Sequence, residues 1–287
     1  MRKYWFTLLC LLVSLGWGHA QVSVDILLDQ EQFLRDESLV LKVRINNLSG
    51  QTLQLGKEAD WLRFRIQADD GTDVMRLSEV PVIEPYVLDS AKAAIRQVDV
   101  MPYYDLSRPG RYSVTATVRI KQWDQEITSQ PRSFDIISGF KLWEQQFGVP
   151  ALKGPPEVRK YILQQANYLK RLMLYVRLSN ATDTQAFRVL PIGPMVSFSR
   201  PEALLDKRSN LHVLSQSGAW SFIYVVISPH GTVLLRQRHE YTDTRPVLRS
   251  TEDGQVLVHG GIRRITMADI PPPAAETATN NVTAPQQ

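Results

Sequence analysis

The feature that most constrains the fold is a two-residue alternation of apolar and polar side chains in the first half of the chain. The alternation runs through residues 38–46, 61–67 and 111–121. In the longest run one side carries Tyr112, Val114, Ala116, Val118 and Ile120, and the other side is polar. Successive side chains of a β-strand point to opposite faces, so this pattern predicts strands of an antiparallel sheet with one buried face.

Shorter runs and turn signals extend this prediction to a whole domain. We expect further strands at residues 22–28, 95–100 and 133–137, with turns at residues 46–50, 69–72 and 109–110. About seven short strands within residues 22–138 are typical of a β-sandwich.

One motif before the longest run resembles a known family. Residues 106–112 read Leu-Ser-Arg-Pro-Gly-Arg-Tyr, which resembles the tyrosine corner of bacterial extracytoplasmic immunoglobulin-like modules. The resemblance implies an immunoglobulin-like sandwich in which Gly110 and Tyr112 are structural. The hairpin expected at residues 64–75 is similar to BsuPI-type proteinase inhibitor domains, so an inhibitor-like module is one alternative function. Neither resemblance assigns a binding or inhibitory residue to this chain.

The N-terminus has the three parts of a secretory signal peptide. Arg2 and Lys3 precede an apolar stretch at residues 5–13, and small residues at Gly18 and Ala20 precede Gln21. We therefore expect cleavage near Ala20 and a secreted or periplasmic protein. The apolar stretch is shorter than the roughly 20 residues of a spanning helix, and no later stretch is longer, so the mature chain should have no transmembrane segment.

Composition excludes several classes of function. The single cysteine, Cys10, lies in the expected signal peptide, which excludes disulfides and thiolate chemistry from the mature chain. The formal charge of +4 comes without a charge run, so we expect no nucleic-acid partner. Phosphate-binding glycine motifs and a nucleophile elbow are absent from the sequence, and we predict no cofactor.

The second half of the chain predicts a smaller β-rich domain at residues 157–269, after a linker at residues 139–156. Residues 158–176 fit helical and strand spacing equally, and we favour a strand at residues 171–178. Residues 220–227 are apolar on both faces and predict a central strand, which a turn at residues 228–231 joins to another strand at 232–239.

A similarity at a spacing of 45 residues, from Arg200-Pro201 to Arg245-Pro246, indicates two or three repeat-like units. Residues 206–214 resemble part of a propeller blade, although this length is too short for a closed propeller. The Pro- and Thr-rich residues 270–287 predict a disordered tail.

Candidate sites are few. His212, His239 and His259 are a candidate zinc set, and Asp69, Asp70 and Asp73 a candidate calcium loop, but unrelated histidines and a plain turn explain these residues as well, and we predict no metal. Four aromatic residues in one predicted hairpin are candidates for binding a partner or a sugar, with core packing as the alternative: Trp220, Phe222, Tyr224 and Tyr241.

The sequence therefore predicts a mainly β, exported, non-enzymatic binding or scaffold protein that contacts a protein or glycan outside the cytoplasm. A hydrolase or lyase that acts on polysaccharide through carboxylates of the second domain is a further alternative.

Overall fold

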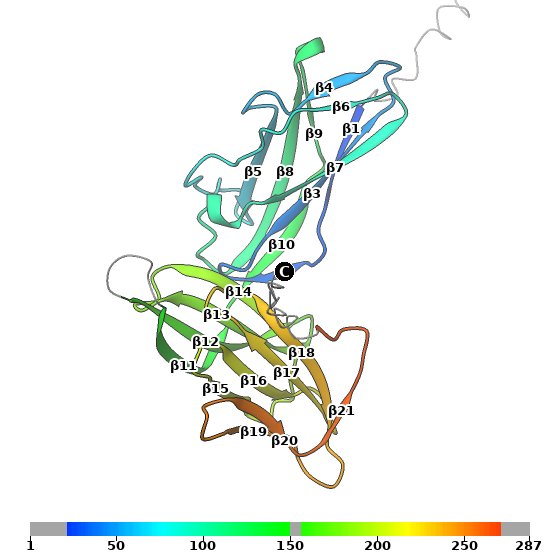
Figure 1. Ribbon diagram of the computed structural model, residues 1–287. Coiled ribbons are helices and arrows are strands. Elements are labelled where there is room, and N and C mark those ends of the chain that lie inside the picture. Colours follow the sequence, from blue (N-terminus) through cyan, green and yellow to red (C-terminus); the bar gives the residue numbers. More distant parts are fainter. Residues whose placement is uncertain (1–21, 150–155, 271–287) are drawn as a thin grey trace, which may run out of the picture. The chain divides into compact units, whose positions relative to one another are not determined.

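The computed structural model describes residues 22–149 and 156–270. The protein is mainly β, with antiparallel sheets, as the alternation predicts (Figure 1). The chain divides into two compact units between Ile137 and Ser138. The expected signal peptide and the expected tail, except for Ile270, lie outside the described residues. No helix within the described ranges has the length and apolar character needed to span a membrane.

The first unit contains two sheets and a small accessory pair. The first sheet has the order β1 (Val22–Leu27), β3 (Val40–Asn47), β7 (Lys92–Asp99). The second sheet has the order β2 (Gln32–Leu34), β10 (Arg132–Ile137), β8 (Gly110–Ile120), β5 (Leu62–Ala68), and β9 (Gln125–Thr128) also pairs with β8. The accessory pair is β4 (Leu53–Leu55) with β6 (Tyr86–Leu88), and two 3-10 helices are η1 (Met101–Tyr103) and η2 (Lys121–Trp123).

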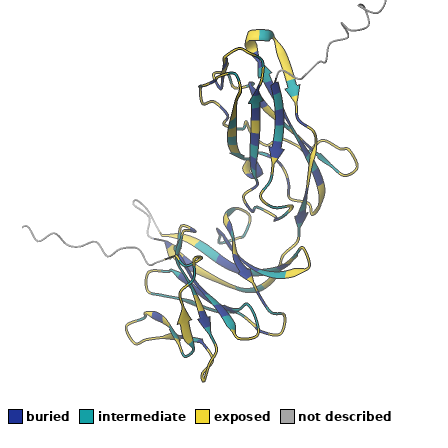
Figure 2. Cartoon of the chain, turned by 90° about the vertical axis from the view of Figure 1, so that its right-hand side faces the viewer, coloured by how far each residue is buried: buried dark blue, intermediate teal, exposed yellow. Residues whose placement is uncertain are grey.

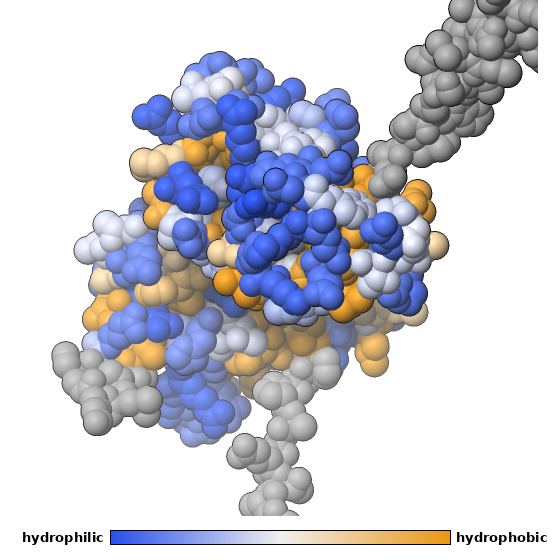
Figure 3. All heavy atoms as spheres, turned by 90° about the horizontal axis from the view of Figure 1, so that it is seen from above, coloured by the Kyte–Doolittle hydropathy of each residue, from blue (hydrophilic) through white to orange (hydrophobic). Residues whose placement is uncertain are grey.

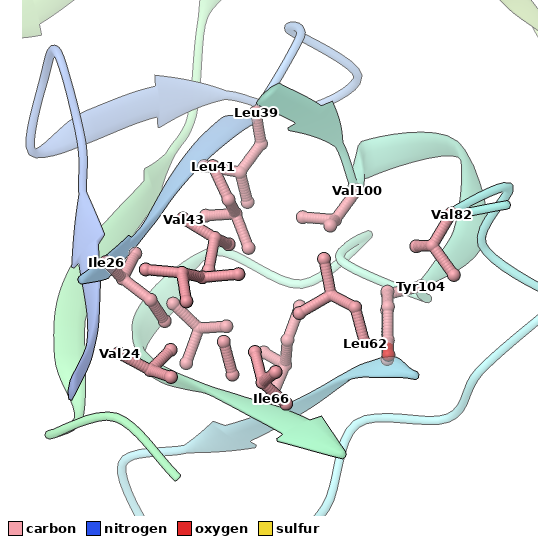
Figure 4. Packing of buried hydrophobic residues seen from close by; sticks show 14 of the residues in the cluster. Val24, Ile26, Leu39, Leu41, Val43, Leu62, Ile66, Val82, Val100 and Tyr104 are labelled. Carbon is pink, nitrogen blue, oxygen red and sulfur yellow. The ribbon is translucent and has the colours of Figure 1, made fainter. Parts of the chain in front are cut away.

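The core of the first unit lies between these two sheets. Val24 of β1 and Val43 of β3 point toward the side chain of Ile66 of β5 (Figure 4), and the same buried cluster includes the apolar residues of β8. The apolar positions of the long run are 5% exposed or less from Tyr112 to Ile120, while the intervening residues are half-buried. Figure 2 shows this alternation of buried and exposed segments along the strands, and the face drawn in Figure 3 is mainly hydrophilic. The two-residue period therefore predicted the buried face correctly.

The second unit contains two larger sheets and one hairpin. One sheet is an antiparallel meander in the order β11 (Phe140–Val149), β12 (Glu157–Tyr168), β13 (Arg171–Asn180), β14 (Ala186–Pro194). The other has the order β15 (Glu202–Leu205), β16 (Leu211–Gln216), β17 (Ser221–Ile227), β18 (Val233–Glu240), β21 (Ile262–Arg264). The hairpin is β19 (Val247–Ser250) with β20 (Val256–His259).

Two expectations change at the start of this unit. The linker expected at residues 139–156 is wrong for residues 140–149, which form β11 and pair with β12 from Phe140 to Val149. The ambiguous residues 158–176 form strands except at a short turn, because β12 and β13 pair with each other over ten residues on each strand. A two-residue turn at Leu169 and Lys170 connects them, with φ of 43° and 66°. Neither residue is Gly or Asn, so the sequence carries no signal for this turn.

Strand β17 is the central strand of its sheet, as predicted, and both of its faces are covered. Val225 and Ile227 pack with the meander sheet through Leu163, Val176 and other buried residues. Phe222, Tyr224 and Val226 face the opposite way and pack with Leu248 and Val256 of the β19–β20 hairpin.

The similarity at a spacing of 45 residues coincides with two hairpins. Strands β15 and β19 begin at Glu202 and Val247, and both hairpins close with a five-residue loop. In each loop the first N–H donates to the fifth carbonyl and the fourth residue has a positive φ, at Ser209 and Gly254. The β17–β18 hairpin has the same loop, with Gly231 at the fourth position. Shared loop geometry therefore accounts for much of the similarity.

Candidate functional site

The four predicted aromatic residues lie on or beside β17 and β18 but do not form one surface. Phe222 and Tyr224 are buried, at 2% and 5% exposure, in the small core below the β19–β20 hairpin. Trp220 and Tyr241 lie just outside the paired strands and are 64% and 37% exposed. Core packing therefore explains Phe222 and Tyr224, and only Trp220 and Tyr241 remain available to a partner.

Trp220 and Tyr241 form an exposed pair. Their ring centroids are 5.6 Å apart with the planes tilted by 52°. The backbone N–H of Tyr241 donates to the carbonyl of Trp220 at 2.8 Å, which extends the β17–β18 ladder by one bond. The pair thus stands on ordered backbone, and its rings offer an amphipathic surface of the kind that binds sugar rings or apolar side chains.

A chain of three hydrogen-bonded polar side chains lies on the same face of this sheet as the Trp220–Tyr241 pair, toward the opposite end of β17. Asp206 opens the β15–β16 loop, His212 is on β16 and Tyr224 is on β17. The carboxylate of Asp206 accepts four hydrogen bonds: from Arg208 N–H at 2.8 Å, Asn210 N–H at 2.8 Å, Asn210 Nδ2 at 2.8 Å and His212 Nε2 at 3.3 Å. A carboxylate has about four lone-pair positions, so Asp206 has no free acceptor position.

The protonation states follow from these contacts. Burial lowers the pKa of His212, and this outweighs the raising effect of Asp206. A neutral imidazole has one donor and one acceptor. Since Asp206 accepts from Nε2, Nδ1 is the acceptor of a hydrogen bond that the Tyr224 hydroxyl donates at 2.7 Å. Burial raises the pKa of Tyr224 to about 12, so this hydroxyl stays protonated.

Burial tends to raise the pKa of Asp206 as well, but the hydrogen bonds from Asn210, His212 and Arg208 outweigh it, and the pKa is lower than usual. Asp206 is therefore ionised and fully bonded at neutral pH. The chain Asp206–His212–Tyr224 holds the loop and two strands together and leaves neither a free base nor a free acid.

A hollow of about 480 Å³ adjoins this chain. It lies between the β15–β16 loop and the β19–β20 loop, with Asp206 and Asp253 among its lining residues. Asp253 is exposed, and the acceptor positions of Asp206 are occupied. The hollow thus lacks the pair of available carboxylates that glycoside hydrolysis requires. The sequence named His212 only as a candidate zinc ligand and did not predict this chain, although Asp206 stands six residues before it, at the start of a predicted turn.

Two of the candidate calcium residues make contacts within the hairpin of residues 64–75. In residues 22–149 and 156–270 no group of three His, Cys, Asp or Glu side chains is placed to hold a metal ion. Asp73 forms an ion pair with Arg65 at 2.8 Å, and Asp70 accepts the N–H of Thr72 at 2.9 Å. The plain-turn interpretation therefore accounts for the aspartates at residues 69–73.

Tyr112 makes the backbone contact that a tyrosine corner requires. Its hydroxyl donates to the carbonyl of Arg108 at 2.7 Å, four residues earlier, and its ring stacks on Phe134 at 5.7 Å. Gly110 lies between Arg108 and Tyr112 and is the first residue of β8. The contact anchors the entry into the longest strand of the first unit.

Comparison with known proteins adds little to this description. No family model matches the chain, and no curated protein matches it. Among solved structures, the sporulation control protein Spo0M from Bacillus subtilis aligns over 72% of this chain and 80% of its own, with 8% identity and a TM-score of 0.28. A similarity of this size supports no inference about fold or function.

Proposed function

We propose that this chain is an exported, non-enzymatic binding or scaffold protein that contacts a protein or glycan partner outside the cytoplasm. In this proposal the first unit is an immunoglobulin-like module that serves as scaffold, and the second unit carries the contact surface. The export part of the proposal rests on the signal-like pattern of residues 1–20.

The strand order supports an immunoglobulin-like first unit. That fold places strands A, B and E in one sheet and C, F and G in the other. Taken in chain order, β1, β3 and β7 correspond to A, B and E, and β5, β8 and β10 to C, F and G. Tyr112 near the start of β8 then occupies the tyrosine-corner position of strand F, with its hydroxyl bonded to Arg108.

The observation that carries the binding proposal is the exposed Trp220–Tyr241 pair. Tryptophan and tyrosine dominate the energetics of binding surfaces because a rigid ring buries a large area at little entropic cost. A tryptophan that is 64% exposed, fixed beside a second ring and not needed by the core, has no evident structural role. The polysaccharide-hydrolase alternative gains no support here, because Asp206 is fully bonded.

Capture experiments test this proposal. The chain without residues 1–20 is immobilised and exposed to the envelope fraction of its own cell and to a glycan array. We expect Trp220→Ala and Tyr241→Ala to abolish capture. Phe198→Ala, which removes an aromatic side chain that is 80% exposed outside the pair, should leave capture unchanged. Equal capture by Trp220→Ala and the wild type, or glycan hydrolysis without any captured partner, would contradict the proposal.

A further inference from the structure

A second hollow of the second unit, of about 420 Å³, contains two arginines of β18. Arg236 and Arg238 are two residues apart on one strand and therefore point to the same face of the sheet. Ile223 of β17 and Pro194 of β14 contribute apolar lining. This size and this mixture of apolar walls with a few polar groups are typical of small-molecule sites.

Both guanidinium groups contact neutral acceptors. Nη2 of Arg236 donates to the carbonyl of Pro191 at 3.3 Å, and Nη2 of Arg238 donates to Oγ of Ser221 at 2.7 Å. Arg236 is half-buried, and burial lowers its pKa. In the part of the chain that the structure describes, neither arginine has a carboxylate partner. A partly desolvated guanidinium with neutral partners favours the arrival of an anion.

The nearby carboxylates are already engaged. Asp269 lines the hollow, but it accepts from the N–H and hydroxyl of Thr266 at 3.3 and 2.8 Å and from Arg263 at 3.4 Å. Glu240, two residues beyond Arg238, forms an ion pair with Arg264 at 2.8 Å. Asp269 and Glu240 are therefore each paired with another arginine. These two carboxylates do not neutralise the positive charge of Arg236 and Arg238.

We propose that this hollow binds a small ligand through an oxyanion group, a carboxylate or a phosphate, with an apolar portion of the ligand against Ile223 and Pro194. The planar fork of a guanidinium matches either oxyanion in bidentate geometry, and two forks from one strand face hold it from adjacent positions. The site is independent of the Trp220–Tyr241 contact, so it stands or falls separately from the proposed function.

Titrations of the full mature chain test the site with three probes: inorganic phosphate, butyrate and the uncharged butyramide. We expect saturable binding of phosphate or butyrate and none of butyramide, with amide shifts in the NMR spectrum confined to residues around Arg236 and Arg238. Tighter binding of butyrate indicates a carboxylate ligand with an apolar part, and tighter binding of phosphate indicates a phosphorylated one.

The variants Arg236→Gln and Arg238→Gln should each weaken binding by about tenfold or more, the size of one lost charge-assisted contact. Arg249→Gln is the matched control, because it removes the same charge from an exposed position on β19. Arg238 is exposed, so its variant should keep the wild-type spectrum even if Arg236→Gln disturbs folding. Absence of saturable binding up to about 10 mM of either anion, or equal weakening by Arg249→Gln, would overturn the proposal.

Discussion

The hydrogen bond between Tyr224 and His212 gives the sharpest test of the polar chain. Tyr224→Phe removes one hydroxyl and leaves the ring in its place among Phe222, Leu248 and Val256. The bond is 2.7 Å long, and both partners are buried, at 5% and 7% exposure. Losing the bond costs about 1 kcal/mol, and leaving Nδ1 of His212 buried without a donor adds about 1–2 kcal/mol.

We therefore expect Tyr224→Phe to lower the free energy of unfolding of the second unit by about 2–3 kcal/mol. Urea titrations monitored by NMR signals of that unit provide the measurement. Tyr241→Phe removes a hydroxyl from a more exposed ring and serves as the control, with a change below about 0.5 kcal/mol.

A second readout separates this bond from packing. The Tyr224 hydroxyl donates to Nδ1 and thereby stabilises neutral His212, so its removal should raise the pKa of His212, which NMR titration of the ring protons measures. If Tyr224→Phe lowered the free energy of unfolding no more than Tyr241→Phe and left the pKa of His212 unchanged, the assigned hydrogen bond from the Tyr224 hydroxyl to Nδ1 of His212 would be wrong.

Three further predictions concern the β12–β13 turn, the buried histidines and the N-terminus. Lys170→Gly should stabilise the protein by about 1 kcal/mol in urea titrations. Lys170 has a left-handed conformation with φ of 66°, which costs a residue with a side chain about that much. A loss of stability would show that Lys170 does not have this conformation. Burial lowers the pKa of His212 and of His239 from 6.5, so the unfolded chain binds protons that the folded chain does not as the pH falls below 6.5. The free energy of unfolding should therefore fall from pH 7 toward pH 5, and replacing both histidines by Gln should flatten that slope. Mass spectrometry of the protein exported from its own cells should give Gln21 as the first residue, whereas an intact Met1 would exclude cleavage near Ala20.

Much of the first unit could be predicted because its strands are buried on one face. The six strands expected there are all present, with ends that differ by at most a few residues, from β1 at Val22 to β10 at Ile137. Strands such as β2 and β4 are three residues long and were missed. Such strands are too short to show a period, and only pairing with β10 and β6 makes them strands.

The second unit was less predictable because several of its strands are covered on both faces. Strand β13 has buried residues without interruption from Leu174 to Ser179, so alternation could not distinguish it from a helix. Strand β11 was expected to be part of a linker because Gly148 and Pro150 interrupt the pattern of the sequence there, and only its pairing with β12 decides its structure.

The candidate site shows the same division. The sequence by itself determined that residues 220–227 form a strand rich in aromatic side chains, because β-branched and aromatic residues favour an extended backbone. Only the tertiary structure decided that the β19–β20 hairpin covers Phe222 and Tyr224 and leaves Trp220 and Tyr241 exposed. The backbone state of a strand depends on neighbouring residues, whereas the burial of its side chains depends on segments that are distant in sequence.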